Sequence, residues 1–135
     1  MSRIFLDSNI ILYLLSADTR KADTAQSLLS EAPCISVQVL NEVTSVCLRK
    51  LKMNWSEIHD LLAVVKTTCQ IEPLTAATHA QAVQIAQTHQ ISFYDAHILA
   101  AAKAAGASIL MTEDMHNGQT LLGIQIQNPF KQGST

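Results

Sequence analysis

The chain has 135 residues, of which 48% are hydrophobic and 15% are charged. This length suits one domain with a real core, and this composition excludes an intrinsically disordered chain. The formal net charge of −2 excludes a global basic field that attracts nucleic acid, so any such contact must come from a local patch. The low charged fraction leaves apolar surface for a partner, and we expect an oligomer or a bound protein.

Short apolar runs alternate along the chain with segments of helical periodicity. In chain order they predict a strand at 4–6, helices at 10–15 and 21–31, a strand at 34–37, helices at 39–51 and 54–66, a strand at 70–72, helices at 75–89 and 94–105, and strands at 108–111 and 124–126. Alternation between apolar and polar residues marks the last strand as an edge strand. Asn54 with Glu57 is a capping-box pattern, Thr75 is a good helix cap, and Gly106 is a helix stop.

Strands that alternate with helices predict βαβ units, and therefore an α/β domain with helices on both faces of a mainly parallel sheet of about five strands. We expect a single domain over residues 1–130 and a flexible tail over residues 131–135. The three cysteines have neither disulfide nor zinc spacing, so we read them as buried apolar residues of a reducing cytoplasm. The sequence shows no signal peptide and no membrane-spanning run, which predicts a soluble cytoplasmic protein.

Four acidic residues stand at the ends of apolar runs: Asp7, Glu42, Asp95 and Asp114. Asp7 and Asp114 directly follow predicted strands, while Glu42 and Asp95 lie near the starts of predicted helices. The carboxyl ends of parallel strands and the N-termini of the following helices meet at one edge of such a sheet. We therefore expect these four carboxylates to converge there.

A cluster of carboxylates must raise its pKa values or bind a cation. Oxygen-only ligands favour Mg²⁺ or Mn²⁺ over zinc. A site of this kind can bind a scissile phosphate and lower the pKa of an attacking water. Each acid also has a simpler interpretation: Asp7 as a helix cap, Asp95 as a partner of the helix dipole, Glu42 on a solvated face and Asp114 in a turn.

The acids and their neighbours resemble the motif series of PIN-domain ribonucleases, and most closely the VapC toxins of bacterial toxin–antitoxin pairs. The resemblance spans residues 3 to about 130, and its motifs are FLDSN at 5–9, NEV at 41–43, YDA at 94–96 and TED at 112–114. It implies a PIN-like three-layer α/β/α fold and Mg²⁺- or Mn²⁺-dependent endonucleolytic cleavage of RNA. It also implies a homodimer and a cognate VapB-like antitoxin that blocks the site.

By motif position the resemblance makes Asp7, Glu42, Asp95 and Asp114 the catalytic, metal-binding residues. It gives supporting roles to three neighbours. Asn9 would order the hydrogen bonds behind Asp7, Thr112 would support Asp114, and Ser8 stands where many relatives carry Thr. Glu113 is an additional acid, and the family spacing favours its neighbour Asp114 as the ligand.

Basic residues gather at two places, Arg20 with Lys21 and Arg49 with Lys50. Either pair is a candidate contact for the RNA backbone, although basic residues at a helix end also complement the helix dipole.

Two other functions remain open from sequence. A receiver-like signalling domain also has an acidic magnesium pocket, but it needs an acid pair after the first strand, where Asp7 stands alone. It also needs a basic partner at a strand end, whereas Lys103 lies within a predicted helix. A regulatory protein that only binds a partner would carry the acids without using them.

Overall fold

A computed structural model describes residues 3–131. In chain order the elements are β1 (Ile4–Leu6), α1 (Ser8–Leu12), the 3₁₀ helix η1 (Tyr13–Leu15), α2 (Thr19–Leu29), β2 (Cys34–Ser36), α3 (Val37–Arg49), α4 (Trp55–Thr68), β3 (Gln70–Glu72), α5 (Ala76–His89), α6 (Phe93–Ala104), β4 (Ile109–Met111), β5 (Thr120–Leu121) and β6 (Ile124–Gln127). The expected tail at 131–135 falls, apart from Lys131, outside the described residues.

The strands form one sheet in the order β3-β2-β1-β4-β6-β5. Every neighbouring pair is parallel except β5 and β6, which are antiparallel. The prediction of a mainly parallel α/β sheet is therefore confirmed. The sheet has six strands rather than about five, because β5 contains two residues and leaves no periodic signal in the sequence.

The last strand was expected at the edge of the sheet, and this prediction is wrong. β6 lies between β4 and β5, with Leu110 opposite Ile126 and Leu121 opposite Ile124. Its alternating pattern has a different cause, since Ile124 and Ile126 are buried while Gln125 is exposed. One face of β6 thus points into the core and the other into solvent.

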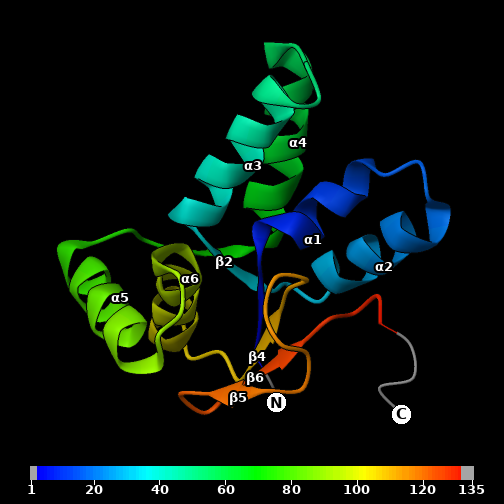
Figure 1. The fold of residues 1–135 in the computed structure, drawn as a ribbon. Coiled ribbons are helices and arrows are strands. Elements are labelled where there is room, and N and C mark those ends of the chain that lie inside the picture. The colour runs from blue at the N-terminus through cyan, green and yellow to red at the C-terminus, as the bar shows by residue number, and fades with distance from the viewer. Residues whose placement is uncertain (1–2, 132–135) are drawn as a thin grey trace.

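Helices cover both faces of the sheet, as predicted. In Figure 1, α5 and α6 pack together on one side, α1 and α2 lie on the other, and the pair α3–α4 rises beyond the carboxyl ends of the strands. Helix starts follow their caps: Asn54 and Glu57 form the predicted capping box at α4, and Thr75 caps α5. Among the helices of residues 3–131, none has the length and apolar character needed to cross a bilayer.

The core is built on the strands. Phe5, Leu6, Ile35, Leu110 and Ile126 are completely buried between the helical layers. Burial of a large apolar side chain stabilises a fold by about 1.5–3 kcal/mol, so these short strands are held by their side chains as much as by their ladders. This rigid sheet fixes the positions at which the chain leaves each strand.

Candidate active site

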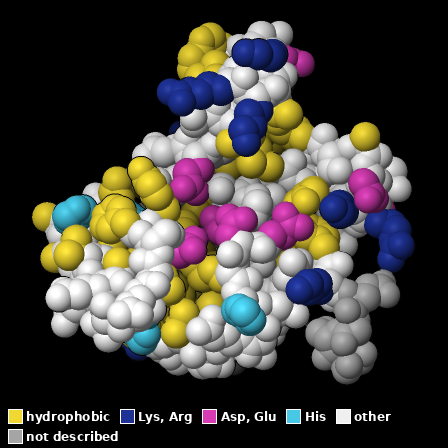
Figure 2. Space-filling model, viewed as in Figure 1, with side chains coloured by type: hydrophobic (Ala, Val, Ile, Leu, Met, Phe, Trp, Pro, Cys, Tyr) yellow, Lys and Arg dark blue, Asp and Glu magenta, His cyan; other side chains and the backbone are white. Residues whose placement is uncertain are grey.

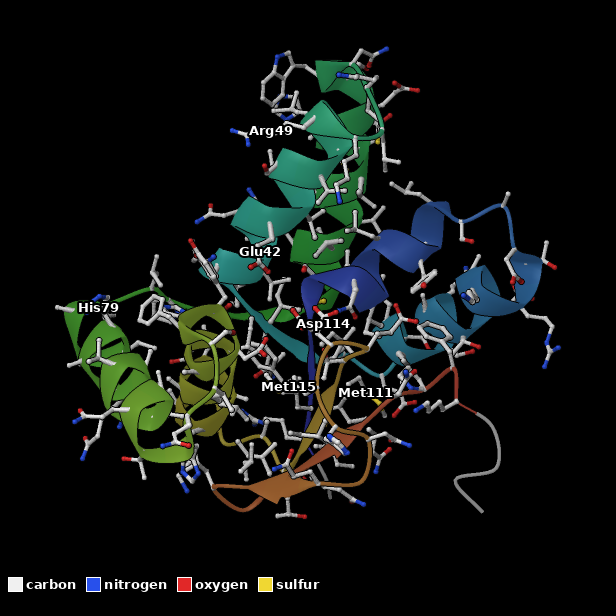
Figure 3. The ribbon with its side chains drawn as sticks, viewed as in Figure 1. Glu42, Arg49, His79, Met111, Asp114 and Met115 are labelled. Atoms are coloured by element: carbon white, nitrogen blue, oxygen red, sulfur yellow. The ribbon has the colours of Figure 1, made fainter. Side chains whose placement is uncertain are left out.

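Two of the predicted site residues, Asp7 and Asp114, follow strands that end at the same edge of the sheet. β1 and β4 are parallel neighbours with Leu6 opposite Met111, so Asp7 and the segment 112–114 emerge side by side. Figure 2 shows acidic side chains gathered as a band across the middle of one face, below the projecting α3–α4 pair. Glu42, on α3, and Asp114 lie on the same side of the molecule in Figure 3.

Asp7 is the most deeply placed of the acids, with 4% of its surface exposed. Its Oδ1 accepts a hydrogen bond from the Ser8 amide at 2.7 Å, and its Oδ2 accepts one from the Thr112 hydroxyl at 2.8 Å. Burial raises the pKa of Asp7 to about 6, against the lowering effect of these two hydrogen bonds, and the charges of Glu42 and Asp114 raise it further. Asp7 is therefore both the cap of α1 and a carboxylate whose ionised form is disfavoured by burial and by nearby negative charges.

Asp114 is held from two sides. Its amide donates to the Thr112 hydroxyl at 3.1 Å, and its Oδ2 accepts from the Asn9 side-chain amide at 3.1 Å. The Asn9 carbonyl oxygen in turn accepts from the Glu113 amide at 3.3 Å. Asn9 lies in the first turn of α1, and both groups of its side-chain amide bond to the segment of Asp114. Its expected role in ordering the hydrogen bonds behind Asp7 stays a prediction.

Glu113 has a hydrogen-bond partner of its own. Its carboxylate accepts from the Tyr13 hydroxyl, with distances of 2.9 and 3.1 Å to its two oxygens. Lys21 lies on the far side of this tyrosine, 3.5 Å from its hydroxyl and 4.8 Å from its ring centroid. Tyr13 thus engages Glu113, and Asp114 is the neighbour whose charge acts on Asp7 and Asp95.

Asp95 and Glu42 complete the band from two helices. Asp95 lies in the first turn of α6, where its amide donates to the capping hydroxyl of Ser92 at 3.1 Å. Burial raises the pKa of Asp95, and the charge of Asp114 raises it as well. Glu42 is half-buried on α3, and its carboxylate accepts from the Gln38 amide one turn earlier at 3.5 Å.

The donor set fits a hard divalent cation. All its ligand atoms are carboxylate oxygens, and the charges that act on the buried Asp7 come from further carboxylates. Within residues 3–131, however, no three acidic, histidine or cysteine side chains lie close enough to hold one ion directly. Two carboxylates about 4 Å apart repel by roughly 4 kcal/mol at an effective dielectric of 20. This repulsion favours a wider separation of the carboxylates when no cation lies between them. Mg²⁺ needs only one or two carboxylates besides waters and substrate oxygens, so this spacing is compatible with it.

The two basic pairs lie at different distances from the acids. Arg20 and Lys21 line a hollow of about 370 Å³ that Tyr13 connects to Glu113. Arg49 stands at the far end of α3 in Figure 3, and Lys50 follows it; both are exposed. Seven residues of helix between Glu42 and Arg49 correspond to about 10 Å along the axis, so Arg49 and Lys50 lie well beyond Glu42.

Three side chains that hold the acids were not singled out from sequence. Ser92 stands three residues before Asp95, which is the spacing of a capping residue and could have been recognised. Gln38 stands one helical turn before Glu42, which is also a readable spacing. Tyr13 has no such signal, because its partner Glu113 is 100 residues away in sequence.

Comparisons with known proteins agree with this architecture. The family described as "PIN domain" matches residues 4–116. A toxin–antitoxin complex from Klebsiella pneumoniae superposes with a TM-score of 0.72 at 20% identity, over 96% of this chain and 99% of that one. VapBC2 from Rickettsia felis, bound to a promoter DNA fragment, gives 0.67 at 19% identity over 93% and 97%. VapC20 from Mycobacterium tuberculosis, described as a Sarcin-Ricin loop cleaving toxin, gives 0.62 at 23% identity over 82% and 89%.

No curated protein matches the sequence. Structural similarity at these identities establishes the fold, whereas the family rests on the sequence match, which covers most of the chain and includes all four acids. This chain belongs to the PIN domain family.

Proposed function

We propose that this protein is a metal-dependent endoribonuclease and the toxin of a toxin–antitoxin pair. The observation that carries the proposal is the band of carboxylates at the carboxyl edge of the sheet, together with the buried Asp7. A nearly inaccessible carboxylate whose charged neighbours are both carboxylates is costly to keep ionised despite its two hydrogen bonds, unless a cation joins it. Membership of the PIN family and the toxin neighbours support the same assignment.

Asp7, Glu42, Asp95 and Asp114 would hold Mg²⁺ or Mn²⁺, one or two of them directly and the others through metal-bound waters. The bound ion would lower the pKa of an attacking water and offset charge on the scissile phosphate. Cleavage joins the water oxygen to phosphorus and breaks one phosphorus–oxygen bond of the backbone, without a covalent enzyme intermediate. Thr112 keeps Asp7 and Asp114 in register through its single hydroxyl, and Asn9 holds the Asp114 carboxylate.

RNA would approach from the side of Lys21 and Arg20. Lys21 is held against the Tyr13 ring, whose hydroxyl bonds the neighbour of Asp114, and its positive charge can contact the RNA backbone near the cleaved bond. Arg49 and Lys50 stand at the far end of α3 and would contact only a longer RNA.

An antitoxin of the VapB type needs a surface beside the site. A hollow of about 360 Å³ lies between α1–η1 and α3, with Leu12, Leu15, Val46 and Leu51 in its wall. Leu15 and Leu51 are 41% and 47% exposed, which suits burial by a partner. Asn9 and Glu113 also line this hollow, so a segment bound there lies next to the acids.

The remaining proposals concern the oligomeric state and the cellular location of the protein. Further exposed apolar side chains favour a homodimer, and a site of action in the cytoplasm suits three buried, free cysteines. A receiver-like role is not supported, since the Lys103 ammonium donates to the Leu122 carbonyl at 3.3 Å, two helical turns away from Asp95.

The test is cleavage of a mixed, structured RNA pool by purified protein, with and without Mn²⁺ or Mg²⁺, beside Asp7→Asn and Asp95→Asn. We expect metal-dependent cutting that both variants lose while they keep the fold. Cutting by both variants would refute the assignment. A folded protein that neither cuts RNA nor binds divalent metal in calorimetry would instead be a partner-binding regulator.

A further inference from the structure

A second hollow lies beside the acids, and the proposed chemistry does not use it. This aromatic cavity has a volume of about 380 Å³, and six of the side chains in its wall are Gln38, Leu74, His79, Phe93, Tyr94 and His97. They come from the start of α3, the connection before α5, α5 itself and the first turns of α6. The volume lies in the range of small-molecule pockets.

The aromatic cavity adjoins two of the four acids through its lining residues. Tyr94 directly precedes Asp95, and the Gln38 amide in its wall donates to Glu42 at 3.5 Å. Figure 3 labels His79 on α5 and Glu42 on α3, the helices at its two ends. A ligand group in the cavity would therefore lie next to a phosphate held at the acids.

The wall presents ring surfaces to solvent. Phe93 is 37% and Tyr94 is 64% exposed, which is high for large apolar side chains. Phe93 is central, with its ring centroid 5.5 Å from that of His79, 5.9 Å from that of His97 and 6.0 Å from that of Tyr94. A cluster of four rings fixed at the mouth of a polar site is suited to stacking on a planar ligand.

One residue of the wall also has a buried nitrogen without a hydrogen-bond partner. His97 is 5% exposed, and its Nδ1 is the sole buried side-chain nitrogen or oxygen without a partner in residues 3–131. A buried polar atom without a partner is unfavourable, and this one belongs to a residue that lines the cavity. None of the described residues that line the cavity is Lys or Arg, so a phosphate is not the favoured ligand.

We propose that the aromatic cavity binds one nucleobase of single-stranded RNA, next to the phosphodiester at the acids, and sets the base preference there. Planar rings match the base faces, and the amide, imidazole and hydroxyl groups match a base edge. The inference rests on the proposed ribonuclease function. It adds to that function the part of the substrate that is recognised.

The test uses two exposed wall residues and a matched aromatic outside the cavity. Tyr94→Ala and His79→Ala alter the wall, and both residues are exposed, so the fold should persist. Trp55→Ala removes a side chain that is 57% exposed at the start of α4, near the far end of α3. Each protein with Mn²⁺ cuts a random-sequence RNA library, and sequencing of the new ends gives the base preference on either side of the cut.

We expect the wild type to prefer certain bases at one position beside the cut. Tyr94→Ala should lower cleavage at preferred sites by about 5- to 150-fold, the equivalent of about 1–3 kcal/mol for one stacked base, and should flatten that preference. His79→Ala should act in the same direction, and Trp55→Ala should leave rate and preference unchanged. A wild type without preference at any flanking position, or a preference that survives both wall variants, overturns the proposal.

A binding measurement separates this inference from the nuclease assignment. Fluorescence anisotropy with labelled homo-oligoribonucleotides of A, C and U is carried out on Asp7→Asn, with and without Tyr94→Ala, in chelator. Base-dependent affinity that Tyr94→Ala removes supports the cavity even when the wild type cuts nothing. If Tyr94→Ala and His79→Ala convert a dimer to a monomer in light scattering and leave base-dependent binding intact, the face is a contact between copies and the inference is wrong.

Discussion

The hydroxyl of Thr112 donates to the Asp7 carboxylate at 2.8 Å, although 105 residues separate the two in sequence. The same hydroxyl accepts from the Asp114 amide at 3.1 Å. One buried oxygen therefore sets the distance between two acids from different strands. The parallel pairing of β1 with β4 places it there, because Leu6 and Met111 are register partners.

Replacement of Thr112 tests this link. Thr112→Val removes a donor to a buried carboxylate and an acceptor for an amide, so we expect a loss of about 1–3 kcal/mol in the free energy of unfolding. RNA cleavage should fall as well, because the two acids are no longer held together. Thr112→Ser keeps the hydroxyl and should retain most of both. Urea unfolding and cleavage assays measure this, and equal behaviour of Val and Ser would contradict the role of the hydroxyl.

The pH dependence of stability follows from Asp7. Its pKa is raised from 3.8 to about 6, so the folded state binds a proton more tightly than the unfolded state. The stability due to this proton is fully present below about pH 4 and is lost as the pH rises through 6, a change of about 3 kcal/mol. Metal-free wild type should lose stability over this window in urea unfolding, and Asp7→Asn should show a flatter profile. A wild-type profile as flat as that of the variant would argue against a raised pKa of Asp7.

Bound divalent metal should offset the loss of stability that follows ionisation of Asp7. A ligand at about 100 times its Kd adds about 2.7 kcal/mol to the free energy of unfolding, so Mn²⁺ should raise the Tm of the wild type by several degrees. Asp7→Asn and Asp95→Asn should show little or no rise. Asp60→Asn, which changes an exposed carboxylate on α4, is the matched control and should respond like the wild type. An equal rise in all four proteins would place the metal elsewhere.

The two basic pairs should differ in RNA binding. Lys21→Met keeps the apolar stem against Tyr13 but removes the charge, so it should weaken binding and lower the salt slope by about 1. Lys50→Met, near the far end of α3, should change neither for a short RNA. Filter binding of an uncleaved RNA to Asp95→Asn across a salt series measures both. Identical slopes for the two variants would count against an approach along Lys21.

The cap of α4 offers a stability change apart from the site. The Asn54 side chain accepts from the Glu57 amide at 2.8 Å, and the Glu57 carboxylate accepts from the Asn54 amide at 2.9 Å. Asn54→Ala should cost about 1 kcal/mol in urea unfolding and leave cleavage per folded molecule unchanged. A selective loss of cleavage would show that α4 takes part in the site.

Local patterns of residues specify the features of this protein that depend on neighbouring residues. Helix caps such as Asn54 and Thr75, buried strands such as residues 4–6, and the order of strands and helices follow from local hydrogen bonding and apolar periodicity. The four acids were also found from sequence, since each ends an apolar run. Their common edge followed from the general geometry of parallel sheets, while their role as metal ligands stays a prediction.

Tertiary structure alone decided which groups meet. Tyr13 bonds Glu113, while the charge of Asp114 acts on Asp7, and nothing near Glu113 in the sequence indicates this. The sheet position of β6 and the burial of His97 likewise depend on segments far apart in the chain. Side-chain partners across the sheet are set by packing and register, and these are properties of the whole fold that no local pattern of residues records.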